Sequence, residues 1–363
     1  MARSILCVVG ARPNFMKIGP VIAALVRHGL SAPLVHTGQH YDETMNDRFF
    51  IDLGLPRPDV NLDVGSASHA VQTAEIMRRF EPVLDQYAPT AVLVVGDVNS
   101  TIACALVAVK KGIKVIHVEA GLRSGDRTMP EEINRLLTDQ ISDWLFTTER
   151  EAGDNLAREG IASDRVVFVG NVMIDTLLAQ RSRAVPAATT LAGRGGSAPH
   201  ALVTLHRPSN VDCPQTLARL VGALSEMAGL LPVVFPVHPR TRARLEATGL
   251  TSRLEQAGVI LLPPQGYLQM LGLMAEAKMV VTDSGGIQEE TTALGVPCLT
   301  ARDNTERPIT LTQGTNTLVG QDPAVILAAC RDVLTTGGKA GRQPELWDGQ
   351  AGERIAATLA ARL

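Results

Sequence analysis

Aromatic residues are scarce in this sequence, and long apolar runs are absent. Phe, Trp and Tyr make up 3% of the 363 residues, so Ala, Val, Leu and Ile must fill the interior. That aliphatic bias is typical of parallel sheets that helices bury on both faces. No apolar run approaches the length that spans a bilayer. Because the N-terminus passes directly into a predicted strand, we expect neither a signal peptide nor attachment to a membrane.

Cysteine is also infrequent, and the cysteines do not cluster. The five positions are Cys7, Cys104, Cys213, Cys298 and Cys330, with no CxxC or Cys/His group among them. This odd number at wide spacing argues against a disulfide framework and against structural zinc. We therefore expect a cytoplasmic protein in which each cysteine is a small buried apolar residue.

Charge of one sign is not in excess either. The formal net charge is −3, and 20% of the residues are charged. Such a balance provides no general positive field for nucleic acid or for an anionic membrane, and we expect neither as a partner. An anionic ligand would have to be held by a few well-placed cations.

Short β-rich apolar runs alternate with longer helical runs, as in repeated βαβ units. The strands predicted in the first half are Ile5–Gly10, Leu34–Thr37, Ala91–Gly96, Val115–Val118, Trp144–Thr147 and Val166–Gly170. Those predicted in the second half are Ala201–Leu205, Val233–Val237, Val259–Leu262, Met279–Thr282, Pro297–Thr300 and Thr317–Val319. Between the halves, a stretch of Ala, Gly, Thr, Ser and Pro predicts a poorly ordered linker. The fold class is therefore α/β, with Rossmann-like doubly wound domains at 1–183 and 200–345 joined by a linker at 184–199.

In such sheets ligands bind beyond the carboxyl ends of the strands, and polar side chains follow several of these strands. Arg12 and Lys17 follow the first strand, where a helix N-terminus can also receive an anion. Asp97 and Glu119 follow two later strands, and Glu131 begins the next predicted helix beside a second acid. Close carboxylates perturb each other's pKa, and a site built from them can supply both an acid and a base. The alternative for these acids is helix capping, and for the cations a solvated loop.

The second half carries basic residues at its strand ends. His206 and Arg207 close one predicted strand and His238 closes another, a pattern that favours anion binding over structural histidines. The segment Ser284-Gly285-Gly286 begins a helix that suits a diphosphate. Glu290, about one turn further, could accept hydrogen bonds from ribose hydroxyls. Arg307 could reach a phosphate or could belong to a solvated loop.

The sequence does not predict a metal site. His36 and His40 flank Thr37-Gly38-Gln39, but the helix that would bring two histidines at this spacing onto one face is not expected directly after a strand.

The ordered motifs together resemble the non-hydrolysing UDP-N-acetylglucosamine 2-epimerases. The segments that carry the resemblance are GARPNFMKIGP, HTGQHYD, GDVNS, EAGLRS, MPEEINR, LHRPSN, TDSGGIQEE, TERP and GTN, from Gly10 to about Gly320. The resemblance implies a GT-B-type fold with an interdomain cleft, and a C-terminal helix at 346–363 that packs back on the first domain. It also implies a reaction without a cofactor, in a homodimer. In that reaction UDP leaves as the C2 proton is removed, and UDP then adds back to a glycal.

The same resemblance assigns roles to residues of this chain. The predicted catalytic residues are Asp97, Glu119, Glu131 and His206. The predicted contacts to the UDP-sugar are Arg12, Lys17, Arg207, His238, Gln265, Ser284, Gly285, Gly286, Glu290 and Arg307. Gln39 and His40 fall where some bacterial members bind a second UDP-sugar as an activator. Which carboxylate is the base is left open.

Four other functions remain as alternatives. The HTGQHYD form of the second loop also occurs in relatives that act on oxidised diacetamido sugars, so a UDP-2,3-diacetamido uronic acid is an alternative substrate. A hydrolysing epimerase would perform the same elimination and release UDP. A glycosyltransferase of the same fold would need an acceptor site, and a UDP-sugar sensor would not need the acids. Ser209 stands where many relatives have Glu, and no role is assigned to it.

Overall fold

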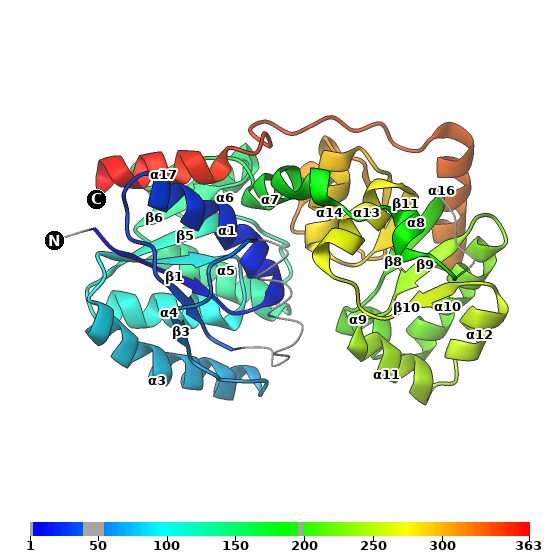
Figure 1. The fold of residues 1–363 in the computed structure, drawn as a ribbon, viewed down its shortest axis with the longest axis horizontal. Coiled ribbons are helices and arrows are strands. Elements are labelled where there is room, and N and C mark those ends of the chain that lie inside the picture. The colour runs from blue at the N-terminus through cyan, green and yellow to red at the C-terminus, as the bar shows by residue number, and fades with distance from the viewer. Residues whose placement is uncertain (1–2, 39–53, 195–198) are drawn as a thin grey trace. The chain divides into compact units, whose positions relative to one another are not determined.

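The computed structural model describes residues 3–38, 54–194 and 199–363, which form two compact α/β units (Figure 1). The first unit comprises Met1–Ala179 together with Glu345–Leu363, and the second comprises Gln180–Pro344. Each is a parallel sheet whose strands alternate with helices along the chain. The predicted α/β class with two Rossmann-like sheets is confirmed.

The sheet of the first unit has the order β3-β2-β1-β4-β5-β6-β7 in the described part of the chain, and every neighbouring pair is parallel. The strands are β1 (Ile5–Val9), β2 (Leu34–His36), β3 (Val60–Asn61), β4 (Ala91–Val95), β5 (Lys114–Ala120), β6 (Trp144–Thr147) and β7 (Val166–Phe168). The chain leaves β1 toward one edge and returns to pair β4 with the other side of β1. Such a switch point is where an open parallel sheet binds its ligand.

The helices of this unit lie along the strands they connect. They are α1 (Arg12–Arg27), α3 (His69–Tyr87), α4 (Asn99–Lys110), α5 (Pro130–Ile141), α6 (Arg150–Arg158), η1 (Ser163–Arg165), α7 (Val172–Gln180) and α17 (Ala351–Arg362). Residues from β1, β4, α3 and α4 form an aliphatic core with one aromatic residue, Phe80, which agrees with the low aromatic content.

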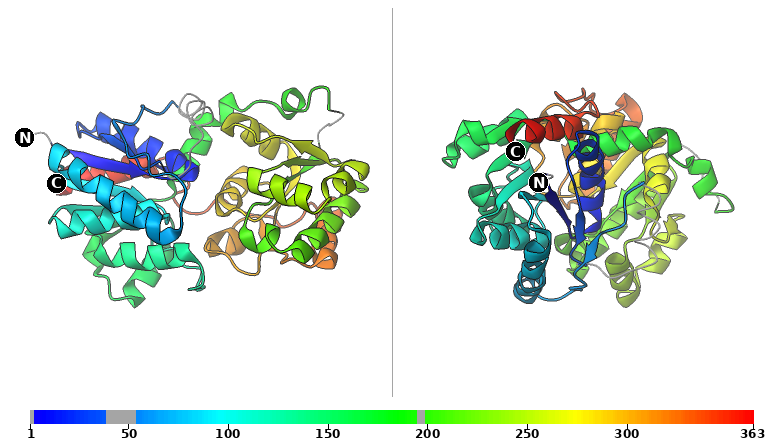
Figure 2. Two further views of the ribbon diagram at one scale, coloured as in Figure 1. Left: turned by 90° about the horizontal axis from the view of Figure 1, so that it is seen from below. Right: turned by 60° about the vertical axis from the view of Figure 1, so that its left-hand side comes forward.

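The C-terminal helix α17 packs against α1, and both lie side by side in every view (Figures 1 and 2). Asp175 of α7 accepts hydrogen bonds from the backbone N–H groups of Ala351 and Gly352 at 3.1 and 2.7 Å, and thereby caps α17 from another helix. Trp347 is fully buried and donates to the Thr148 carbonyl at 3.2 Å. These contacts make the last residues of the chain part of the first unit.

The sheet of the second unit has the order β10-β9-β8-β11-β12-β13, which repeats the arrangement of the first six strands of the other sheet, again with parallel pairs throughout the described residues. The strands are β8 (His200–Thr204), β9 (Val233–Pro236), β10 (Ile260–Leu262), β11 (Ala277–Thr282), β12 (Cys298–Thr300) and β13 (Asn316–Leu318). The helices are η2 (Arg181–Arg183), α8 (Ala187–Thr190), α9 (Pro208–Val211), α10 (Pro214–Ala228), α11 (Pro239–Ala247), α12 (Thr251–Gln256), α13 (Tyr267–Ala275), α14 (Gly285–Leu294), α15 (Pro308–Thr312) and α16 (Pro323–Thr336). The core of this unit draws every member from within its own sequence, between Ala201 and Val333.

The predicted linker is more ordered than its composition suggested over residues 184–194. Val185 donates its backbone N–H to the Leu268 carbonyl of α13 at 3.0 Å. Ala187 and Leu191 are buried. The expectation of poor order is therefore wrong for these residues, because the few apolar side chains among them find cover on a neighbouring helix. Among the described residues no helix is both long enough and apolar enough to cross a membrane.

Candidate active site

A buried ion pair lies at the carboxyl edge of the first sheet. Lys17, in the second turn of α1, places its Nζ 2.6 Å from Oε2 of Glu119, at the end of β5. Both side chains are buried. Glu119 adopts a left-handed backbone conformation with φ 72°, where the pairing register of β5 with β6 also shifts. The strand therefore bends at this residue. We infer that this strained backbone directs the carboxylate toward α1.

The loop after β4 approaches the same ammonium group. Gly96 has φ +67°, and a Cβ at this position would lie 3.1 Å from Lys17 Nζ and 3.2 Å from Asn14 Nδ2. Glycine adopts this backbone conformation without strain, and any larger residue would also press on both side chains. Asn14 also donates to the Val95 carbonyl at 2.8 Å and so ties α1 to β4. Lys17, Glu119 and the loop that contains Gly96 and Asp97 thus lie together at one edge of the sheet.

Arg135 of α5 holds the Asp97 carboxylate, and sequence reasoning missed it. Its Nε donates to Asp97 Oδ2 at 2.9 Å, and its Nη1 donates to Glu132. Asn134 donates to the Asp97 backbone carbonyl at 2.9 Å. Only the i, i+3 spacing of Glu132 and Arg135 in MPEEINR could have indicated this arrangement.

The two adjacent acids at the start of α5 occupy different environments. Glu132 is buried and accepts hydrogen bonds from the backbone N–H groups of Ser124 and Gly125 at 3.0 and 2.9 Å. Glu131, the predicted catalytic acid, is only partly buried in the first turn of the helix. Glu132 therefore organises the loop, and Glu131 retains access to solvent or to a ligand.

In the second unit, Asp283 joins two loops at the carboxyl edge of the sheet. It follows β11 and accepts hydrogen bonds from the backbone N–H groups of His206 and Arg207 at 3.0 and 2.9 Å, and from Asn210 Nδ2 at 3.0 Å. Burial alone would raise the pKa of Asp283, but the hydrogen bond to His206 and those to Arg207 and Asn210 hold it below its usual value. A charged Asp283 thus fixes the two predicted residues His206 and Arg207.

His206 and His238 lie together at this edge. Their ring centroids are 5.5 Å apart. His206 Nδ1 lies 3.1 Å from Asp283 Oδ1, and its side chain is 41% exposed. His238 caps α11 by accepting from the Arg240 backbone N–H at Nδ1, so in the neutral ring the proton is on Nε2. The accessible ring of His206 suits proton donation or contact with an anion.

Arginines and buried acids surround the start of α14. Arg307 Nε lies 3.0 Å from Glu289 Oε1, Arg302 Nη2 donates to Glu306 at 2.8 Å, and Arg207 lies 3.6 Å from Glu306. Burial would raise the pKa of Glu306, but the three arginines lower it well below the usual range. The resulting charge network places three arginines beside a helix N-terminus, where an anion is favoured.

Two predicted small residues lie at this helix start. Ser284 is the N-cap of α14 and makes no capping hydrogen bond with its side chain. Gly285 faces Glu306, whose Oε1 would be 2.4 Å from a Cβ. Gly286 is in the first turn of α14. A larger residue at position 285 would require the Glu306 carboxylate to move out of the charge network.

Glu290, predicted as a ribose contact, is buried on α14 and has a partner that the sequence did not reveal. Tyr267 Oη of α13 donates to Glu290 Oε1 at 2.8 Å. Burial raises the pKa of Glu290 to about 7, although the hydrogen bond from Tyr267 lowers it. This carboxyl group therefore titrates near neutral pH.

The remaining predicted positions are placed as follows. Arg12 is the first residue of α1. Gln265 donates its side-chain amide to the Pro263 carbonyl at 2.7 Å, within its own loop. Gln39 and His40 lie outside the described residues. Within the described ranges, no group of three or more His, Cys, Asp or Glu side chains is arranged to hold a metal ion.

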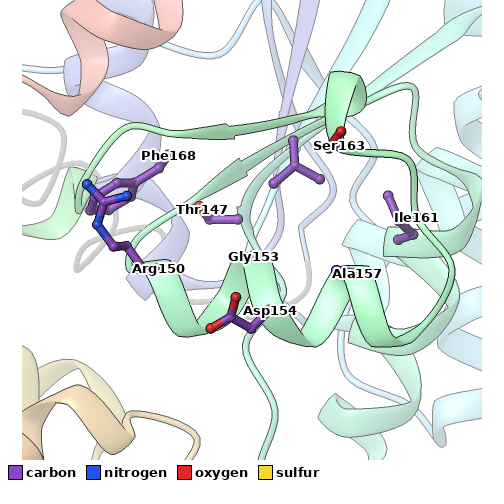
Figure 3. Close-up of a pocket in the computed structure, with 9 residues that line it drawn as sticks. Thr147, Arg150, Gly153, Asp154, Ala157, Ile161, Ser163 and Phe168 are labelled. Carbon is purple, nitrogen blue, oxygen red and sulfur yellow. The ribbon is translucent and has the colours of Figure 1, made fainter.

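A cavity of about 410 Å³ opens elsewhere in the first unit, between α6 and the strands β6 and β7 (Figure 3). Arg150 lies over the Phe168 ring there, 5.1 Å from its centroid. None of the predicted site residues lines this cavity. We therefore assign the candidate site to the charged residues at the sheet edges and not to this cavity.

The sequence matches the model of a family described as UDP-N-acetylglucosamine 2-epimerase over residues 23–360. The UDP-N-acetylglucosamine 2-epimerase of Methanocaldococcus jannaschii is 41% identical, with 97% of each chain covered. The UDP-2,3-diacetamido-2,3-dideoxy-D-glucuronate 2-epimerase of Pseudomonas aeruginosa is 43% identical, with 98% of this chain and 99% of the relative covered.

A solved structure gives the same result. The Methanocaldococcus jannaschii UDP-GlcNAc 2-epimerase in complex with UDP-GlcNAc and UDP superposes with a TM-score of 0.91 at 39% identity, with 99% of both chains covered. Since sequence and fold agree over nearly the whole length, this chain belongs to the UDP-N-acetylglucosamine 2-epimerase family, whose members are isomerases.

Proposed function

We propose that this protein interconverts UDP-GlcNAc and UDP-ManNAc by inverting C2 of the sugar. The observation that carries the proposal is the pair of acids at one sheet edge, each beside a buried cation: Glu119 with Lys17, and Asp97 with Arg135. Acids held in fixed positions can remove and return a proton, which is the chemistry that inversion at C2 requires.

The proposed reaction has two halves. In the first, a carboxylate takes the C2 proton and the C1–O bond breaks, so that UDP leaves with the bonding electrons and a C1=C2 double bond remains. In the second, the UDP oxygen attacks C1 again and C2 receives a proton on its opposite face. Because C2–H is weakly acidic, the C1–O bond must already be breaking when the proton leaves. Asp97, Glu119 and Glu131 are the proposed proton-handling and charge-stabilising groups, with His206 as a further proton donor.

The second unit is proposed to hold UDP. Its diphosphate would meet the start of α14 at Ser284, Gly285 and Gly286. The cations Arg207 and Arg307 lie beside this helix in the charge network described above. Cations there would stabilise the charge on departing UDP. Glu290 is proposed to accept hydrogen bonds from the ribose. The further proposed contacts to the UDP-sugar are Arg12, Lys17, His238 and Gln265.

The reaction is tested by incubating purified protein with UDP-GlcNAc in D2O, without added NAD or metal. We expect UDP-ManNAc that carries deuterium at C2, because the abstracted proton exchanges with solvent. Retention of the original hydrogen would exclude proton abstraction with exchange. Accumulation of UDP and free sugar would instead indicate a hydrolysing enzyme. Both products are distinguished by proton NMR.

Asp97→Asn tests the role of the acid at nearly constant shape. We expect turnover to fall by about a thousandfold or more, while binding of UDP, measured by calorimetry, changes little. Asp59→Asn is the matched control, because Asp59 accepts a hydrogen bond from the Leu34 backbone N–H at 2.7 Å, at the start of β2. Activity of Asp97→Asn close to that of Asp59→Asn would remove Asp97 from the mechanism.

A UDP-2,3-diacetamido uronic acid is the second candidate substrate. It is favoured by the Pseudomonas aeruginosa relative, which carries that substrate in its name and is as similar to this chain as the UDP-GlcNAc enzymes are. The two candidates are compared by kcat/KM in one panel of UDP-sugars. We expect UDP-GlcNAc to give the higher value. A higher kcat/KM for the uronic acid would show that this sugar is the substrate, and the proposed reaction at C2 would remain the same.

We also propose a homodimer in the cytoplasm. Sedimentation velocity tests the assembly, with twice the mass of one chain as the expected result.

All five cysteines are free, and Cys213 is exposed, contrary to the expectation that each would be buried. Hydrogen bonds from Thr216 lower the pKa of the Cys213 thiol, which favours the reactive thiolate. An exposed thiol of this kind suits a reducing compartment, and fractionation of cells would test the location.

A further inference from the structure

We propose that His117 and Asp139 are positioning residues that hold the two acid-bearing loops, after β4 and after β5, at a fixed spacing. The inference rests on the proposed function, since it concerns Asp97 and Glu119. His117 lies in the middle of β5 and Asp139 on α5, and both side chains have an exposed fraction of 0%. Neither can touch a substrate, so any effect on the reaction passes through other residues.

The hydrogen bonds define the charge of the imidazole. Nδ1 of His117 lies 2.6 Å from Asp139 Oδ1, and Nε2 lies 2.8 Å from the Gly96 carbonyl oxygen. A carbonyl oxygen and a carboxylate only accept hydrogen bonds, so both ring nitrogens must donate. Burial alone would raise the pKa of Asp139, but His117 and Arg123 outweigh burial and lower it. The pair is therefore an imidazolium and a carboxylate inside the protein.

The pair connects both loops. The Gly96 carbonyl belongs to the peptide group that joins Gly96 to Asp97, so His117 fixes the backbone directly before one acid. The second oxygen of Asp139 accepts from the Gly121 backbone N–H at 3.1 Å, two residues after Glu119. One carboxylate and one imidazolium thus join the Asp97 loop to the Glu119 loop.

The backbone of these loops needs such a restraint. Gly96, Glu119 and Gly121 all have positive φ, at 67°, 72° and 79°. A non-glycine residue in this conformation persists only where its surroundings hold it, and Glu119 is one. The Gly96 N–H also donates to the Val118 carbonyl at 3.1 Å, which brings the loops into direct contact.

Charge balance argues for positioning rather than for an electrostatic effect on the acids. Arg123 donates to Asp139 at 2.7 Å and to Glu159 at 2.6 Å, which closes a network of two cations and two anions. A network with zero net charge exerts little field at a distance. Its contribution to the reaction is therefore geometric.

The first experiment uses the unaltered protein. Nitrogen-15 NMR of the imidazole groups should show one histidine with protons on both ring nitrogens, and this signal should disappear in His117→Phe or His117→Gln. A neutral tautomer for His117 would overturn the proposal. This measurement does not depend on turnover, so its failure is separate from failure of the proposed function.

The second experiment separates positioning from stability. Asp139→Asn should lower kcat for UDP-GlcNAc by about a hundredfold, the effect of misplacing a reacting group by about 1 Å, with little change in KM. Asp143→Asn is the matched control, because Asp143 accepts from the Val115 backbone N–H at 2.8 Å at the opposite end of β5. It should lower the melting temperature and leave kcat within about twofold.

Substitutions of His117 give the graded test. Gln retains a donor for the Gly96 carbonyl and Phe retains none, so His117→Gln should keep more of kcat than His117→Phe. The proposal is overturned if both folded variants turn over at the wild-type rate. It is also overturned if kcat in the folded His117 variants falls no further than it does in Asp143→Asn. If wild-type protein epimerises neither candidate sugar, the proposed function fails while the NMR result still decides the protonation of His117.

Discussion

Glu290 shows how burial changes the chemistry of one residue. Its pKa is raised to about 7 by desolvation, so at neutral pH only part of the population carries the carboxylate. Ribose hydroxyls donate hydrogen bonds to a carboxylate but compete with the proton of a carboxylic acid. If Glu290 holds the ribose as proposed, binding requires loss of this proton and strengthens as pH rises through 7.

The affinity for UDP-GlcNAc is therefore expected to increase by about tenfold between about pH 6 and about pH 8, in proportion to the ionised fraction of Glu290. The sugar nucleotide is the right probe because its diphosphate does not titrate in this range. Glu290→Gln should bind more weakly and lose most of the pH dependence, as measured by calorimetry. An unchanged pH profile in that variant would show that Glu290 does not cause the pH dependence.

At the residue scale, sequence reasoning found the side chains that follow strands and missed those that support them. Asp97, Glu119 and Lys17 were predicted because parallel strands end at one edge. Arg135, Tyr267 and the His117–Asp139 pair were not, because each partner comes from a distant segment whose approach only packing decides.

Among the elements, the turn after β5 depends on one glycine. Gly121 has φ +79°, and a Cβ there would lie 2.4 Å from the backbone oxygen of Ala152 on α6. Gly112, between α4 and β5, has φ +72° but no atom within 4 Å of such a Cβ. Both positions carry the same conformational cost for other residues, and only Gly121 adds a collision with backbone.

Gly112→Ala should therefore lower the free energy of unfolding by about 1 kcal/mol. Gly121→Ala should lower it by about 3 kcal/mol or more, because the backbone of α6 must move as well. Urea unfolding of both variants measures the difference. If both variants lost the same free energy of unfolding, the backbone of α6 would be able to shift without an energetic penalty. The close contact would then not constrain the turn.

Most elements were predictable from their patterns, and the exceptions are short. β3 has two residues, one of them polar, and shows no apolar run. α8 lies in a segment whose composition resembles a linker, and its few apolar residues are covered by α13. Such elements form because neighbours provide hydrogen bonds and cover, which a local pattern does not reveal.

For the whole molecule, the division into two units predicts different behaviour of fragments. The second unit is continuous in sequence and has a core of its own, so residues 180–344 should fold alone. The first unit requires its C-terminal part, since Trp347, Ile355 and Leu359 are fully buried. Burial of each of these side chains contributes about 2 kcal/mol to the free energy of folding. Removing all three would therefore cost nearly as much as the total stability of a typical domain.

Circular dichroism and thermal melting test this expectation. The fragment 180–344 should melt cooperatively. The fragment 1–179 should not, and fusing 345–363 to it through a flexible linker should restore a cooperative transition. Cooperative folding of 1–179 by itself would show that α17 is dispensable for the first unit.

The sequence by itself determined the class of fold, the edges of the sheets at which charged residues gather, and the family. These follow from periodicity and from the order of motifs, which are properties of neighbouring residues. The packing of the chain is what makes Glu132 a buried structural acid while Glu131 is more accessible, what brings Arg135 to Asp97, and what places His117 between Asp139 and the Gly96 carbonyl. The reason is that a buried polar group must find a hydrogen-bond or charge partner inside the protein. Those partners come from residues far apart in sequence, so only the packing of the chain brings them together.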